Sequence, residues 1–270
     1  MGYAAIAIAD RNSLAGIVRA HAAAKKKGIR IIVGCRLDLL DGLSLLAYPT
    51  NTSAYSQLCN LLTTGNRRAE KGDCHLYKVD VYQYAKNMKL IVLPPDSLNE
   101  SLEFDPSFAN TLKEYREVFG TGLYIAASRP YQGDDHKYLY RLEQLSAPLQ
   151  IPLVATNDVH YHKPERRQLQ DIVTCIREKC TIYTAGYRLH PNAERHLKPA
   201  KEMRRLFRQY PDAIRRTQEI AEACQFSLNE LKYEYPEEIT QQGRTPQEEL
   251  SFLAWQGAHQ RYGKNVPEKT

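Results

Sequence analysis

Two side chains that can bind a divalent metal lie two residues apart in the second half of the chain. Asp158 and His160 follow residues 151–156, an apolar run typical of a buried strand. Side chains alternate along an extended segment, so both groups point to the same side. Carboxylates and imidazoles both bind divalent metals. If Asp10, which ends another apolar run, converges on the same place, the three indicate a metal-dependent hydrolase.

The same residues also fit a purely structural role. Asn157 and Asp158 can shape a turn, or cap the helix that is expected to begin near Glu165. Periodicity alone leaves both interpretations open.

The elements that would position these side chains alternate along the first two thirds of the chain. Strands are expected at residues 3–9, 29–33, 43–48, 90–93, 123–127 and 151–156. Helices are expected at residues 14–27, 53–62, 107–119, 135–149 and 165–177. Ser13 is expected to cap the first helix and Gly28 to end it. Repeated strand–helix units joined by short loops predict a parallel sheet, closed or doubly wound.

In a closed barrel, the chemistry lies in the loops after the carboxyl ends of the strands. Nine polar residues occupy those positions: Asp10, Arg11, Asn12, Arg36, Arg129, Asn157, Asp158, His160 and His162. After about residue 190 the pattern changes to helices, and Pro199 and Pro211 mark two helix starts. Residues 233–236 are expected to be extended. A final amphipathic segment is expected around Leu250, Leu253 and Trp255.

Composition excludes some classes of protein. With 270 residues, 43% of them hydrophobic, the chain can form a sizeable core. No stretch reaches the roughly 20 apolar residues that span a bilayer, and the start lacks the features of a secretory signal. We therefore expect a soluble, cytoplasmic protein without a membrane partner. The six cysteines include no Cys-x-x-Cys pair and are expected to be buried thiols rather than a metal or disulfide site.

A net charge of +6 is compatible with a polyanionic partner. Candidate phosphate or DNA contacts are the paired arginines Arg204, Arg205, Arg215 and Arg216. A solvated helix face explains such pairs equally well.

Four runs of the sequence resemble the polymerase-and-histidinol-phosphatase (PHP) domain at the front of bacterial C-family DNA polymerases. They are ADRNSLAG at residues 9–16, IVGCR at 32–36, ATNDVHY at 155–161 and FSLNEL at 226–231. Two more runs, NAERHLKP at 192–199 and LKYEYP at 231–236, are more similar to the error-prone, damage-induced branch than to the replicative subunit. The motifs occur in the family's order and extend over nearly the whole chain.

The resemblance implies a distorted seven-stranded β/α barrel. Its first strand–helix unit, with an opening His-x-His motif, is expected to be missing. It also implies a barrel at residues 1–195, a helical extension at 196–235 and the start of the polymerase core at 236–270. In active members, histidines, aspartates, a glutamate and a cysteine bind up to three zinc, manganese or magnesium ions at the strand ends.

The sequence departs from that ligand set. Arg11 stands where the family has a histidine, Arg36 where it has a glutamate, and Arg129 follows the strand that supplies another histidine. Asp10, Asp158 and His160 survive as vestigial ligand candidates. We therefore expect no catalytic residue and no tightly bound metal or cofactor in this chain.

Arg36 is predicted to replace the lost metal charge. A guanidinium is always protonated and can bridge carboxylates. We expect Arg36, helped by Arg11 or Arg129, to pair with Asp10 or Asp158.

The leading hypothesis is a non-catalytic PHP domain that braces the core of an error-prone DNA polymerase. The resemblance implies a role in translesion synthesis, DNA repair and replication. The partners would be the rest of the polymerase chain and, through it, primer–template DNA and a sliding clamp. The carboxylates for nucleotidyl transfer belong to a palm domain beyond this chain. Two alternatives stay open: a stand-alone metal-dependent phosphoesterase or nuclease, and a nucleic-acid-binding module.

Overall fold

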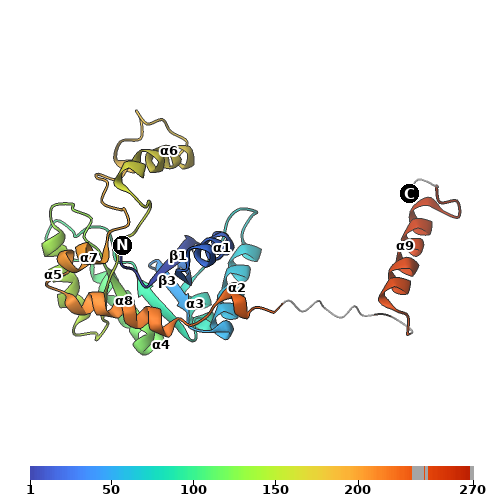
Figure 1. Ribbon diagram of the computed structural model, residues 1–270, viewed down its shortest axis with the longest axis horizontal. Helices are drawn as coiled ribbons and strands as arrows, with labels where there is room; N and C mark the ends of the chain where they lie inside the picture. The colour runs from blue at the N-terminus through green and yellow to red at the C-terminus, as the bar shows by residue number, and fades with distance from the viewer. Residues whose placement is uncertain (233–239, 241–242, 268–270) are drawn as a thin grey trace. The chain divides into compact units, whose positions relative to one another are not determined.

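The computed structural model describes residues 1–232, 240 and 243–267, and the chain divides into two units. The first unit is Met1–Leu231 and the second is Lys232–Thr270. Residues 233–236, predicted to be extended, lie outside the described residues. Figure 1 shows the first unit as a sheet with helices packed around it. None of the helices in the described part of the chain is long and apolar enough to cross a membrane.

The elements of the first unit follow the predicted alternation. The strands are β1 (Ala5–Arg11), β2 (Arg30–Leu37), β3 (Leu45–Pro49), β4 (Met88–Val92), β5 (Leu123–Ala127) and β6 (Leu153–Ala155). The helices are α1 (Ile17–Lys27), α2 (Thr52–Arg68), α3 (Lys78–Tyr84), α4 (Pro106–Phe119), α5 (Asp135–Ser146), α6 (Arg167–Arg177), α7 (Ala200–Leu206) and α8 (Pro211–Ala223). The second unit contains α9 (Pro246–Tyr262).

The six strands form one sheet in sequence order, with β1 and β6 at its edges. This is the expected incomplete β/α barrel followed by helices, and the predicted fold class is confirmed. The expectation of a wholly parallel sheet is wrong, because β3 runs antiparallel to both β2 and β4. Only residues 38–44 join β2 to β3. A connection that short cannot cross over the sheet, so the chain turns back antiparallel.

Both faces of the sheet are covered, since alternate side chains of each strand point to opposite sides. On one face, Leu90, Leu123 and Ile125 pack in a core with buried residues of α2, α4 and α5. On the other face, the neighbouring residues Ile91 and Tyr124 pack in a second cluster that includes buried residues of α8. The sheet is therefore a rigid support whose carboxyl edge can hold side chains in fixed positions.

The first helix begins later than predicted. Asp10 Oδ2 accepts a hydrogen bond from Gly16 N at 2.8 Å, and α1 starts only at the next residue. Ser13 Oγ accepts from Ala15 N at 3.0 Å, within the loop rather than at the helix cap. Gly28 ends the helix as predicted, with a left-handed φ of 64°.

The second unit corrects the expectation of an amphipathic final segment. Thr245 caps α9 by accepting a hydrogen bond from Glu248 N. The apolar side chains Leu250, Leu253 and Trp255 are 61%, 51% and 60% exposed. Leu250 and Leu253 lie on the same side of the helix, about one turn apart, whereas Trp255 points away from both. The three side chains therefore form no single stripe.

The contact between Gly34 and the buried Tyr48 ring gives a test of the core. A Cβ at Gly34 would lie 2.4 Å from Tyr48 Cε1. We expect Gly34→Ala to lower the free energy of unfolding by about 1–3 kcal/mol, because the ring must move within a packed core. Urea denaturation measures this. Gly257→Ala is the control, since nothing lies within 4 Å of its Cβ; an equal loss in both variants would contradict the packing argument.

Candidate functional site

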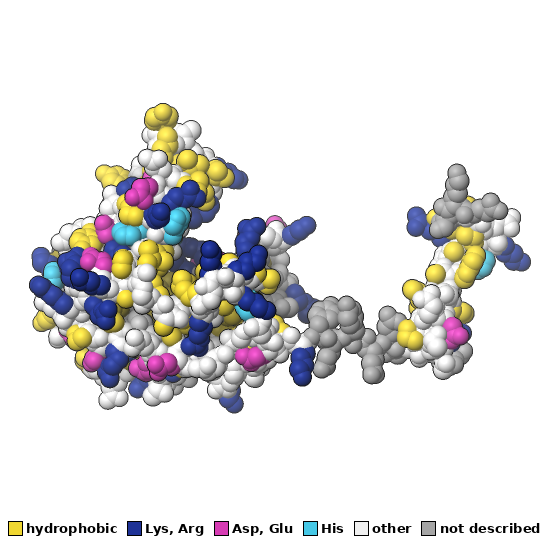
Figure 2. Space-filling model, in the orientation of Figure 1, with side chains coloured by type: hydrophobic (Ala, Val, Ile, Leu, Met, Phe, Trp, Pro, Cys, Tyr) yellow, Lys and Arg dark blue, Asp and Glu magenta, His cyan; other side chains and the backbone are white. Residues whose placement is uncertain are grey.

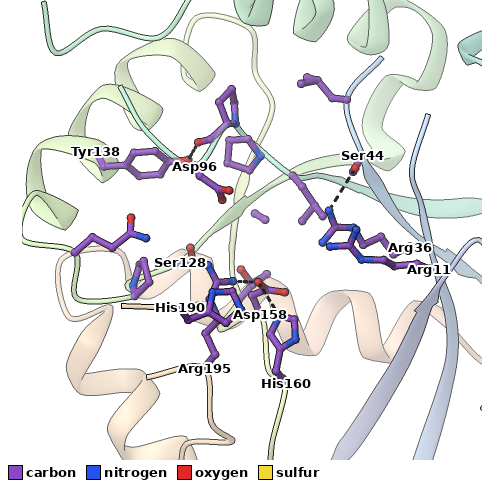
Figure 3. Close-up of a pocket in the computed structure, with 18 of the residues that line it drawn as sticks. Arg11, Arg36, Ser44, Asp96, Ser128, Tyr138, Asp158, His160, His190 and Arg195 are labelled. Atoms are coloured by element: carbon purple, nitrogen blue, oxygen red, sulfur yellow. Dashed lines mark hydrogen bonds and ion pairs between the residues drawn. The ribbon is translucent and has the colours of Figure 1, made fainter. Parts of the chain in front are cut away.

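A cavity of about 450 Å³ opens at the carboxyl ends of the parallel strands. Strand-end side chains line it, with others from α6 and the loops beyond it (Figure 3). The charged and imidazole groups in its lining are Arg11, Arg36, Asp96, Asp134, Asp135, Asp158, His160, Arg177, Arg188, His190 and Arg195. Figure 2 shows basic and histidine side chains gathered around the hollow beneath α6.

Asp158 sits at the centre of this group and is held by Arg195. Arg195 Nη1 forms an ion pair with Asp158 Oδ2, and His160 Nε2 lies 3.4 Å from the same oxygen. Asp158 has a left-handed φ of 38°, a conformation that aspartate tolerates better than most residues. Figure 3 shows Arg195 and His160 flanking the carboxylate. The predicted neighbourhood of Asp158 and His160 is present, with an arginine as its third member.

Two chain segments that lie side by side bring Asp158 and Arg195 together. His160 N donates to Arg195 O at 2.9 Å, and Leu197 N donates to Tyr161 O at 3.0 Å. The Asn157 side chain donates to His196 O at 2.6 Å. These bonds fix the backbone on both sides of the ion pair.

Arg36 has a different partner from the one predicted. Arg36 Nε lies 2.8 Å from Asp38 Oδ1, and Arg11 Nη1 lies 3.2 Å from Asp38 Oδ2. Among the described residues, no ion pair joins Arg36 to Asp10 or Asp158, so the predicted pairing is wrong. Asp38 lies two residues beyond Arg36 along the same extended backbone. It therefore faces the same side and needs no distant contact.

Asp10 and Arg129 serve the fold, away from the cavity lining. Asp10 accepts from Gly16 N, as described above. Arg129 Nη1 donates to Leu206 O at 2.8 Å and so holds the end of α7. The expectation that Asp10 converges with Asp158 is not met, because Asp10 is used to start α1.

The candidate DNA-contacting arginines lie on α7 and α8. Arg205 pairs with Glu202 at 2.7 Å and Arg215 with Asp212 at 3.0 Å. Arg216 Nη1 donates to Leu153 O at 3.2 Å, and Arg204 is exposed. Three of the four therefore have partners within the protein, and their role toward DNA stays a prediction.

The charge around His160 favours its neutral form. Burial lowers the pKa of His160 below its ordinary value. The guanidinium groups of Arg11, Arg36 and Arg177 lower that pKa further. His190, whose ring centre is 5.1 Å from that of His160, also has a lowered pKa, mainly through burial. Burial and the nearby guanidinium groups thus make protonation of both imidazoles less favourable than in water.

The sequence interpretation missed Asp38, Ser44 and Arg195. Asp38 could have been found, because a carboxylate two residues after Arg36 faces the same side. Ser44 donates to Asp38 Oδ1 at 2.5 Å, and only the antiparallel turn brings it there. The role of Arg195 could not be predicted from neighbouring residues, since its partner Asp158 lies in a distant part of the sequence.

Comparison with known proteins gives a partial family match. A family model described as the PHP domain matches residues 1–129. This part of the chain is similar to the PHP domain family. The match covers β1 to β5 and the arginine-bearing ends of β1 and β2. Asp158, His160 and Arg195 lie beyond it.

The PHP match agrees with similarity over the whole chain to larger proteins. The error-prone DNA polymerase of Caulobacter vibrioides is 46% identical over 270 residues, which are 100% of this chain and 24% of that protein. The error-prone DNA polymerase of Allorhizobium ampelinum is 45% identical over 270 residues, with the same coverage. The chain is homologous to these polymerases and spans about a quarter of their length.

A solved structure gives a more distant likeness. An amidohydrolase from Chromobacterium violaceum, with bound SO4 and no metal, is 12% identical to this chain. The match has a TM-score of 0.41 and covers 56% of this chain and 75% of that one.

The residues that line the cavity do not fit the metal cluster that the family resemblance implies. Within the described residues, no group of three or more histidine, cysteine, aspartate or glutamate side chains could hold a metal ion. Asp158 is paired with Arg195, and Arg11 and Arg36 share Asp38. A divalent ion placed here would be repelled by the guanidinium groups.

A double-mutant cycle tests the ion pair between Asp158 and Arg195 at the centre of the cavity. Asp158→Asn and Arg195→Gln keep similar shapes, and asparagine tolerates the left-handed backbone. We expect a coupling energy of roughly 1 kcal/mol in urea denaturation, because Arg195 is largely buried and Asp158 only half exposed. Asp212 and Arg215 form the control pair, with side chains 62% and 70% exposed. Equal coupling in both cycles would contradict a special role for the Asp158 pair.

The charge around His160 gives a prediction for pH dependence. The folded pKa of His160 lies below its unfolded value, so the unfolded chain binds more protons in that interval and stability falls as the pH drops through it. We expect Arg36→Gln to raise the pKa of His160, measured by NMR titration of the imidazole. Arg19→Gln, on the exposed face of α1, is the control. An unchanged pKa in Arg36→Gln would rule out the proposed charge effect.

Proposed function

We propose that the chain is a non-hydrolytic PHP region of an error-prone DNA polymerase, with a structural role toward the polymerase core. The observation that carries this proposal is the Asp158–Arg195 ion pair. It puts an arginine beside the carboxylate that the family resemblance assigns to metal. Phosphoester hydrolysis of the family type depends on metal-activated water, and the described residues offer no donor set for such an ion.

The finer parts of the proposal follow from the relatives. A parent protein of this kind would act in the cytoplasm in translesion synthesis and DNA repair. It would bind primer–template DNA and a sliding clamp through parts outside this chain. The proposed regions are a barrel at residues 1–195, a helical extension at 196–235 and the start of the polymerase core at 236–270. Homology to proteins about four times as long supports the assignment of DNA and clamp binding to parts outside this chain.

Two assays test the proposal. The 270-residue chain should neither extend a primer nor hydrolyse bis(p-nitrophenyl) phosphate when Mn²⁺ or Zn²⁺ is added, because the residues that the structure describes offer no metal-binding donor set. A chimera in which residues 1–270 replace the matching stretch of the Caulobacter polymerase should extend primers. Metal-dependent hydrolysis that is lost in Asp158→Asn would contradict the proposal and favour the phosphoesterase alternative. A folded chimera without polymerase activity would contradict the polymerase assignment.

Removing a positive charge tests whether the pocket retains a shape for metal. Arg36→Glu supplies a carboxylate at the position where the family has one and deletes a cation. We expect calorimetry with Zn²⁺ or Mn²⁺ to detect little binding in either protein, since Arg195 still neutralises Asp158. Arg36→Gln is the control for the charge alone. Tight binding by Arg36→Glu only would show that the cavity keeps a metal geometry.

A further inference from the structure

The helix α6 turns its polar side toward the protein and its apolar side toward water, the reverse of an ordinary surface helix. Its polar residues Gln170, Thr174 and Arg177 line the cavity. Thr174, which is polar, is 5% exposed. In an ordinary surface helix the apolar stripe faces the protein and the polar side faces water. Here the polar side faces the protein's own cavity.

The apolar side of α6 faces water. Leu169, Ile172, Val173 and Ile176 are 46%, 52%, 50% and 72% exposed. They are spaced three and four residues apart, so they form one stripe along the helix. Figure 2 shows apolar side chains over α6, where Figure 1 shows the helix standing off from the sheet.

The segment after α6 extends this apolar surface. Ile182 is 48% exposed, and Tyr183 and Tyr187 are 95% and 108% exposed. We name these three side chains and the four of α6, all exposed on residues 169–187, the arm surface. Soluble proteins rarely leave so many large apolar side chains together in water, and such a surface marks an interaction site.

The arm, residues 162–190, is attached firmly enough to present this surface in one orientation. The Arg167 guanidinium donates to His190 O across the two ends of the arm. Asn192 Nδ2 donates to Pro130 O at 2.7 Å. Because its base is tied to the barrel, the arm surface is not free to turn inward and bury its own apolar residues.

We propose that the arm surface docks against a part of the polymerase chain that lies outside these 270 residues. This inference rests on the proposed function. The relatives match this chain along its whole length, yet the match is only 24% of their own. The remaining three quarters of such a protein is covalently attached, which gives it a high effective concentration beside the arm. The occupant is therefore an apolar patch of the polymerase core.

Limited proteolysis tests the docking in full-length protein. Trypsin cleaves after Arg177, Lys179 and Arg188, which are all exposed in this chain. In the full-length chimera described above, we expect cleavage at these sites to slow by about tenfold relative to the 270-residue chain, because a docked arm must open first. Ile172→Glu with Ile176→Glu should restore fast cleavage in the chimera. Circular dichroism checks that each variant is folded.

A matched control and separate readouts make the outcomes distinguishable. Val79→Glu, at a residue of α3 that is 64% exposed, should leave the protection unchanged. Equal cleavage in chimera and 270-residue chain would overturn the docking. Protection of the 270-residue chain itself that is lost on dilution would overturn it too, since a second copy would then be the occupant. Primer extension by the same chimera tests the proposed function alone, because an active chimera with an unprotected arm contradicts only the docking.

Discussion

Carboxylates gathered at one edge of a sheet repel one another unless cations stand between them. In this chain the cations are arginines. Arg195 neutralises Asp158, and Arg11 and Arg36 share Asp38. The pairs of Asp158 with Arg195 and of Arg11 with Asp38 join separate segments of the chain, whereas Arg36 and Asp38 are near neighbours in the sequence. Burial lowers the pKa values of His160 and His190, and nearby guanidinium groups lower both pKa values further.

The antiparallel return of β3 adds Ser44 to the pair that Arg36 forms with its sequence neighbour Asp38. Because only residues 38–44 join β2 to β3, the chain turns back at the carboxyl edge itself. Asp38 and Ser44, at the two ends of that turn, then lie beside Arg36: Asp38 Oδ1 is 2.8 Å from Arg36 Nε, and Ser44 Oγ is 3.5 Å from Nη2. A helical crossover in the same place would have carried the chain away from the edge. Arg36 therefore has two local partners: Asp38 through its place in the sequence, and Ser44 through the turn.

Local patterns predicted the parts of the fold that depend on local forces. Buried strands are apolar runs, and Gly28 ends α1 because glycine adopts the left-handed conformation easily. The direction of β3 depends on the length of the loop at residues 38–44. A loop this short predicts an antiparallel neighbour, so the sequence does contain the information. The partner of Asp158 could not be predicted, because electrostatic attraction acts on whichever arginine the tertiary structure brings near. Asp10 was misassigned for a similar reason, since a carboxylate at a strand end can equally well accept a backbone N–H group.

The orientation of α6 follows from the same electrostatics. The cavity needs polar lining, because buried charges such as Arg195 require polar neighbours. Gln170 and Thr174 help to meet that need from α6. A helix that turns its polar side inward must turn its apolar side outward, and the free energy of hydrating that side is unfavourable. Contact between α6 and an apolar surface would remove the apolar side of the helix from water, while its polar side still lines the cavity. The polar lining of the cavity and the apolar arm surface are therefore two sides of the same helix, and the charged groups of the cavity favour this orientation of α6.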